Sequence, residues 1–110
     1  MGVSERAIDR TLAALADPHR RAAVDLLREG PRAASDLART LGLTAPAMSR
    51  HLRALKESDL VEDSHPAFDA RVRIYSLKTA RLDELRDWLA LAEAHWTTQL
   101  AAFKAHLEGE

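Results

Sequence analysis

Apolar side chains recur at spacings of three and four residues along most of the chain, which gathers them on one face of an α-helix. The pattern predicts four helices before residue 59: Ser4 to about Ala16, Pro18 to Gly30, Ser35 to Leu41, and Ala45 to Ser58. Ser4 and Asp17 are residue types that cap helix N-termini, and Pro18 suits a first helical position. Gly30 with the following proline ends the second helix.

The third and fourth predicted helices are joined by a glycine turn. Gly42 can adopt the positive φ that such a turn requires. Thr44 is a good N-cap, and Pro46 lies in the first turn, where its missing N–H costs nothing. The apolar stripe Met48, Leu52 and Leu55 gives the fourth helix one buried face. The pattern of residues 35–58 therefore predicts a helix-turn-helix.

The opposite face of the fourth helix is polar. Pro46, Arg50 and Arg53 fall roughly opposite the apolar stripe, and Ser49 lies on its flank. Two guanidinium groups and a hydroxyl suit a helix that lies in a DNA major groove. The first-turn amides and the Thr44 hydroxyl can serve a phosphate. The alternative is an ordinary helical hairpin whose arginines are merely solvated.

The hydrophobic period changes after Asp59. Residues 60–64 and 71–77 alternate apolar and polar side chains around a turn-like segment at 65–70, so residues 60–77 predict a β-hairpin, or wing. Arg71 and Arg73 are two residues apart, which predicts that they share one face of the second strand. From there they could reach phosphate or a minor groove.

A fifth helix is predicted over residues 79–107. Its apolar stripe runs for about 25 residues, and the helix spans roughly 40 Å, longer than so small a domain can cover. We therefore expect a twofold dimer, with two recognition helices about 34 Å apart on an inverted repeat. The expected interface residues are Ile8, Leu12, Leu82, Leu85, Leu89, Trp96 and Phe103. The alternatives are that the helix folds back over its own core, or that Trp88 and Trp96 line a ligand pocket.

Composition changes this picture little. The chain has 110 residues, of which 46% are hydrophobic and 30% charged, which predicts one domain over residues 1–110. The expected fold class is mainly α with a small β-hairpin: a winged helix-turn-helix with a long C-terminal dimerisation helix. There is no cysteine, which excludes disulfides, thiolate metal sites and cysteine catalysis. Residues 1–10 lack an apolar run, so we expect no signal peptide, no membrane span and a cytoplasmic location. The net charge of −1 does not exclude nucleic acid, because residues 79–110 carry three basic and six acidic side chains and leave the remainder basic.

Enzyme chemistry is not indicated. No Ser, His and Asp stand at a spacing that suggests a nucleophile, and no glycine-rich loop could hold a nucleotide, so we expect no enzyme and no cofactor. His19 lies near a helix start, where capping or a phosphate contact is the simplest role. His51 lies toward the core side of the fourth helix, and His65 lies in the wing.

The chain resembles the ArsR/SmtB group of bacterial winged-helix repressors in four segments. These are LADPHRRAAVDLL (15–27), DLARTLGL (36–43), SRHLRAL (49–55) and LVE (60–62). The resemblance implies a homodimer that binds double-stranded DNA at a palindromic operator and leaves when a signal arrives. Helix face and resemblance together give the expected DNA-binding residues: Thr44, Ala45, Pro46, Ser49, Arg50, Arg53, Arg71 and Arg73. The wing departs from its more basic relatives by holding Pro66, Asp63 and Asp69 beside its arginines.

Some relatives bind zinc on their last helix, and Glu93, His95 and His106 resemble that ligand spacing. The match lies near the chain end, and Gly109 stands where a further ligand is expected, so we expect no metal site and a metal-independent repressor. Two other functions remain: a zinc-responsive repressor that uses these histidines, and a winged helix that binds another protein. The sequence does not indicate the inducer.

Overall fold

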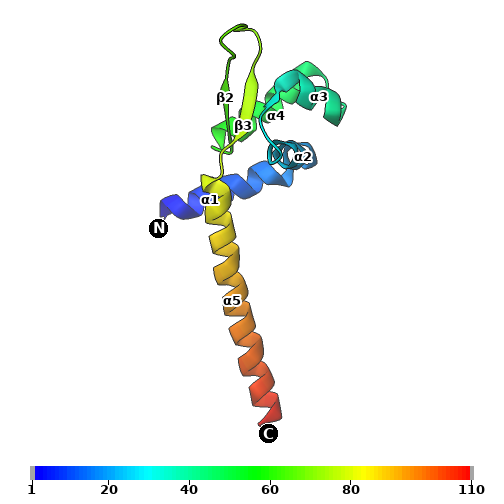
Figure 1. Cartoon of the computed structure of the whole chain (residues 1–110). Coiled ribbons are helices and arrows are strands. Elements are labelled where there is room, and N and C mark those ends of the chain that lie inside the picture. The colour runs from blue at the N-terminus through cyan, green and yellow to red at the C-terminus, as the bar shows by residue number, and fades with distance from the viewer. Residues whose placement is uncertain (1, 110) are drawn as a thin grey trace.

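The computed structural model describes residues 2–109, and side chains from residue 7 onward. The elements are α1 (Gly2–Ala16), α2 (Pro18–Leu27), β1 (Arg32–Ala33), α3 (Ala34–Leu41), α4 (Ala45–Glu57), β2 (Val61–Ser64), β3 (Ile74–Leu77) and α5 (Ala80–Glu108) (Figure 1). The predicted fold class, a mainly helical winged helix with a small sheet and a long last helix, is confirmed.

The predicted helix starts hold where a side chain caps the helix. Asp17 Oδ1 accepts hydrogen bonds from the backbone N–H groups of His19 (2.8 Å) and Arg20 (3.2 Å) at the start of α2. Thr44 Oγ1 accepts one from Ala47 N–H (3.2 Å) at the start of α4. The predicted start at Ser4 is wrong because α1 already begins at Gly2. The side chain of Ser4, and with it the capping prediction, lies outside the described side chains. The predicted end of the second helix at Gly30 is wrong, because α2 ends at Leu27 and the N–H groups of Glu29 and Gly30 donate to the Leu26 and Leu27 carbonyls in tighter turns.

The core lies among α1 to α4 and the base of the sheet. α4 contributes the predicted stripe, since Met48, Leu52 and Leu55 are at most 1% exposed. Leu37 from α3 and Leu60, just before β2, are also fully buried. Gly42 has a φ of 68° at the end of α3, and its positive φ lets α4 turn back across α3. The helix-turn-helix is therefore fixed by burial on one side and by a glycine at its turn.

The sheet has three antiparallel strands in the order β1-β3-β2. β1 was not predicted, because two residues are too short to show an alternating pattern. In β1, Arg32 pairs with Tyr75 and Ala33 with Ile74 of β3. β3 begins at Ile74, three residues later than predicted, because turn hydrogen bonds from Asp69 N–H to the Pro66 carbonyl and from Val72 N–H to the Asp69 carbonyl hold the preceding segment.

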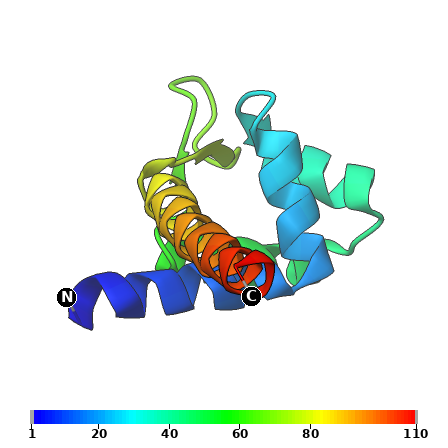
Figure 2. The same cartoon turned by 90° about the horizontal axis from the view of Figure 1, so that it is seen from below.

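α5 leaves the rest of the molecule. Its start lies against α1, and the remainder extends away, so that the molecule measures 71 × 30 × 21 Å (Figures 1 and 2). None of its 29 residues is buried, although Leu82 packs against the core. The alternative in which this helix folds back over its own core is therefore wrong for the chain as described. No described helix combines the length and apolarity that a bilayer span requires.

Candidate nucleic-acid interface

The outer face of α4 carries the predicted groove-facing residues. Burial of the opposite stripe fixes the rotation of the helix, so Arg50 and Arg53 are exposed, as are the four other predicted residues of this helix start, Thr44, Ala45, Pro46 and Ser49. Neither arginine forms an ion pair with any residue that the structure describes. Their charges are therefore available to a ligand.

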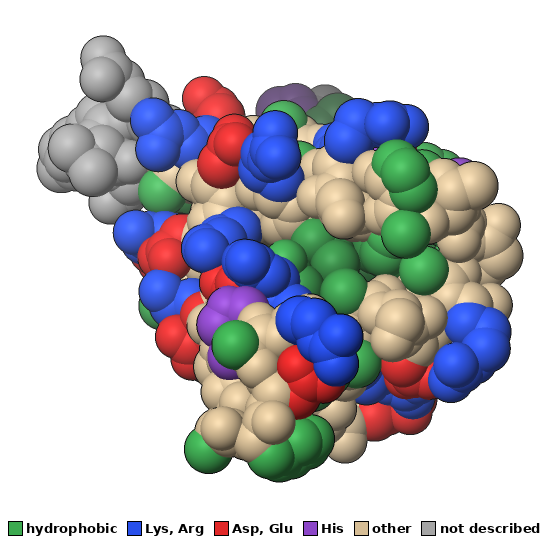
Figure 3. Space-filling model, turned by 90° about the horizontal axis from the view of Figure 1, so that it is seen from above, with side chains coloured by type: hydrophobic (Ala, Val, Ile, Leu, Met, Phe, Trp, Pro, Cys, Tyr) green, Lys and Arg blue, Asp and Glu red, His purple; other side chains and the backbone are tan. Residues whose placement is uncertain are grey.

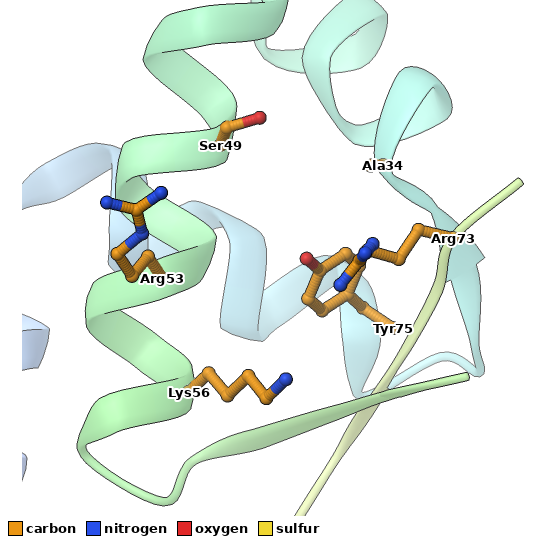
Figure 4. A pocket seen from close by; sticks show the side chains of 6 residues that line it. All are labelled: Ala34, Ser49, Arg53, Lys56, Arg73 and Tyr75. Carbon is orange, nitrogen blue, oxygen red and sulfur yellow. The ribbon is translucent and has the colours of Figure 1, made fainter. Parts of the chain in front are cut away.

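A hollow separates α4 from the base of the wing. It is lined by Ala34, Ser49, Arg53, Lys56, Arg73 and Tyr75. Figure 4 shows Lys56 reaching from α4 and Arg73 reaching from the wing segment toward the Tyr75 ring between them. Lys56 was not among the predicted DNA-binding residues, although its place on the flank of the α4 polar face could have indicated it.

One carboxylate, that of Asp63, neutralises part of the positive charge that lines this hollow. Asp63 is only 9% exposed and pairs with Lys56 Nζ at 2.7 Å and Arg73 Nη1 at 2.6 Å. The hydrogen bond from Lys56 holds the pKa of Asp63 below its usual range, burial opposes this effect, and Arg73 adds to the lowering. Two cations and one anion leave a single net positive charge at this point.

The wing tip is arranged differently from the prediction. Arg71 and Arg73 both precede β3, so the expected shared strand face is wrong, although both side chains line a second hollow beside Ser35 and Ser49. Arg71 is 93% exposed, and its Nε lies 3.3 Å from Asp69 Oδ1. Phe68 is 88% exposed in the same turn. Phe68 was not among the predicted site residues, because a residue in a turn belongs to no periodic face.

Seen from the wing end, this side of the molecule gathers Lys and Arg side chains around a central hydrophobic area, with Asp and Glu among them (Figure 3). The charges alternate in sign, so the surface is not uniformly basic. The unpaired cations of α4 are its strongest feature for an anionic partner, because the wing cations are paired with carboxylates.

The predicted dimer residues fall into two groups. Ile8, Leu82 and Leu85 are half-buried within the chain. Four others are exposed: Leu12 by 43%, Leu89 by 51%, Trp96 by 63% and Phe103 by 61%. Trp88 is 45% exposed, so neither tryptophan of the alternative ligand pocket is enclosed by the chain.

The candidate zinc ligands Glu93, His95 and His106 all lie on the exposed part of α5. His95 and His106 are eleven residues apart on one helix, which separates their backbones by about 16 Å at 1.5 Å per residue. These two histidines therefore cannot share an ion within one chain.

Known proteins share both this sequence pattern and this fold. The family model described as "Bacterial regulatory protein, arsR family" matches residues 17–63, from the N-cap of α2 into β2. The HTH-type transcriptional regulator Rv2034 of Mycobacterium tuberculosis is 41% identical over 105 residues, which cover 96% of this chain and 92% of that protein. The transcriptional repressor SdpR of Bacillus subtilis is 33% identical over 76 residues, covering 69% of this chain and 81% of that repressor.

Among solved structures, an ArsR-like transcriptional regulator from Rhodococcus sp. RHA1 superposes with a TM-score of 0.77 at 30% identity, covering 94% of each chain. The chain belongs to the ArsR family of bacterial regulators. It is a DNA-binding transcriptional regulator, and this family and these relatives are not enzymes.

Proposed function

We propose that the chain acts as a homodimeric repressor that binds an inverted-repeat operator, with α4 of each subunit in a major groove. The main support for this proposal is that Arg50 and Arg53 on α4 are both exposed and form no ion pair with a described residue. A guanidinium group that meets no carboxylate in its own chain keeps its full charge for phosphate or for the O6 and N7 atoms of guanine.

The exposed stripe of α5 supports dimerisation. Apolar side chains from Leu89 to Leu107 lie in one row along the helix, and Trp96, Leu100 and Phe103 are 49–63% exposed. A second copy of α5 offers the same stripe and would remove both from water. Two copies of α4 related by a twofold axis would then read two half-sites about 34 Å apart.

Repression, rather than activation, is supported by the relative SdpR, which is named a transcriptional repressor. A dimer bound to an operator that overlaps a promoter would block access of RNA polymerase without further chemistry. A regulator of bacterial operators works where the chromosome lies, so we place the protein in the cytoplasm.

The experiment is a titration of the protein into a labelled duplex from upstream of its own coding sequence, beside a scrambled duplex, at low and near-physiological salt. We expect a preference of roughly a thousandfold for the upstream duplex. Arg53→Ala should weaken specific binding by about 1–3 kcal/mol because a groove contact is lost. Arg50→Ala should also weaken it.

Arg28→Ala is the matched control, because Arg28 lies beside the start of α5 and pairs with Asp25 at 3.1 Å. Its duplex affinity should equal that of the parent. If Arg50→Ala, Arg53→Ala and Arg28→Ala all bind the duplex like the parent, the DNA-binding surface lies elsewhere. If the parent protein binds no duplex, the result favours a winged helix that binds another protein.

A further inference from the structure

Three side chains of residue types that can ligate a metal meet where the start of α2 lies beside α4. Asp17 at the start of α2, His19 two residues later and His51 of α4 each offer one ligand atom, and these atoms all lie within 4.8 Å of one another. His51 is separated from His19 by 32 positions in the sequence, so the tertiary structure creates this cluster. It plays no part in the proposed contact with DNA.

The two imidazole rings are not occupied by other protein groups. Their centroids are 5.5 Å apart with a tilt of 45°, and neither ring forms a hydrogen bond with another described residue. His51 Nδ1 lies 3.9 Å from Asp17 Oδ1, which is too long for a hydrogen bond. No hydrogen bond therefore joins His51 to Asp17. The exposed ring of His19 lies beside both groups and completes a set of three possible ligands.

Asp17 keeps spare capacity beyond its capping role. Its Oδ1 accepts the backbone N–H groups of His19 and Arg20, and a carboxylate has about four lone-pair sites over its two oxygens. An aspartate carboxylate is an anion at neutral pH, as a metal ligand must be.

We propose that Asp17, His19 and His51 bind one divalent transition-metal ion of the zinc type and so fasten α4 to the junction of α1 and α2. Two imidazoles and one carboxylate are a donor set that zinc accepts, with water in the fourth position. Ligand atoms around tetrahedral zinc are about 3.3 Å apart, given bonds of roughly 2.0–2.1 Å. The ligand atoms lie within 4.8 Å of one another, so each distance needs to shorten by no more than about 1.5 Å. The exposed His19 side chain can make this change by rotation.

His51 is about 160° from Arg53 and about 100° from Arg50 around α4 at 100° per residue. His51 is half-buried, whereas both arginines are exposed. A bound ion would therefore leave both guanidinium groups free to contact DNA. It would act by holding the recognition helix in one position relative to α1 and α2. The binding of metal itself does not depend on the proposed operator.

The test uses tag-free protein and titrates it with Co²⁺, whose visible absorption reports imidazole ligation, and then with Zn²⁺ in competition and by calorimetry. We expect one ion per chain at this site and a rise in unfolding temperature on adding zinc. His19→Ala should lower the affinity by at least about tenfold, because loss of a direct ligand costs no less than loss of its supporting contacts. His19 is exposed, so this variant should fold like the parent.

Asp17→Asn is the second variant, because asparagine caps a helix as well as aspartate does while removing the ligand charge. It should also lose affinity. The matched controls are His65→Ala in the wing and the double variant His95→Ala with His106→Ala on α5, and both should bind cobalt like the parent. Absence of binding in the parent, or loss of binding only in the α5 double variant, would overturn the assignment. Metal binding and duplex binding are read separately, so failure of one leaves the other standing.

Discussion

α4 and α5 are both amphipathic helices with apolar side chains at spacings of three and four, yet their environments are opposite. The stripe of α4 is almost completely buried among α2, α3 and β2, with Leu55 at 0% exposure. The stripe of α5 covers more than twice the length, and no residue of it is buried. The comparison indicates that periodicity shows which face of a helix needs a partner, whereas only the tertiary structure shows whether the same chain supplies one.

The largest effect is expected from placing charges on the α5 stripe. The double variant Trp96→Glu with Phe103→Glu should convert the proposed dimer into a folded monomer, because carboxylates would be buried in the proposed interface. Loss of the second half-site contact should lower operator affinity by about 10²–10⁴-fold. Sedimentation equilibrium and the duplex titration measure the two effects.

Ala94→Glu with Ala101→Glu is the matched control, because both residues lie on the other side of α5 and the added charge is the same. That variant should remain dimeric. If both double variants stay dimeric with unchanged affinity, the stripe is not the interface.

The second comparison removes one leucine from each helix. Leu55→Ala should lower the free energy of unfolding by about 2–5 kcal/mol, because it leaves a cavity in the core. Leu91→Ala on α5, where the side chain is 72% exposed and lies off the stripe, should change it by less than about 0.5 kcal/mol. Urea unfolding at one protein concentration measures both, and equal effects would contradict the difference in burial.

The helix starts offer a third comparison. Thr44 caps α4 through its side chain, whereas Thr79 at the start of α5 forms no such bond. Thr44→Ala should therefore cost about 0.5–2 kcal/mol of stability, and Thr79→Ala should cost almost nothing. Thermal unfolding of the two variants measures the difference; a larger loss for Thr79→Ala would contradict the capping geometry.

The smallest effect concerns the ion pairs of the two helices. Asp63 binds Lys56 of α4, its pKa is lowered from 3.8, and its contribution to stability is therefore present above about pH 4 and lost as the pH falls through its folded-state pKa. At pH 7, Asp63→Asn should cost about 1 kcal/mol or less, because both cationic partners are half-exposed. The variant should also lose less stability than the parent between pH 7 and pH 3.

Asp87→Asn on α5 is its counterpart, because that carboxylate is 71% exposed and lies 3.4 Å from Arg86. Urea unfolding across pH should give this variant the same free energy of unfolding as the parent. An acid profile of Asp63→Asn identical to that of the parent would show that the carboxylate does not stabilise the link between α4 and the wing.

The sequence by itself determined that the helices form, the caps at Asp17 and Thr44, and the exposed face of α4. Thr44, Gly42 and the Met48, Leu52 and Leu55 stripe act within a few residues of one another, so local physical chemistry is sufficient to specify them. The hairpin was predictable for the same reason, although its second strand began later than the alternation suggested.

Only the tertiary structure decided which side chains from distant segments meet. β1 is a strand only because Arg32 and Ala33 lie beside β3, and Asp63 neutralises Lys56 only because the wing folds back against α4. The same holds for Asp17 and His51, and for the fact that α5 packs against α1 only near its start. Contacts over long sequence separations depend on the packing of whole elements, which no local pattern of residues records.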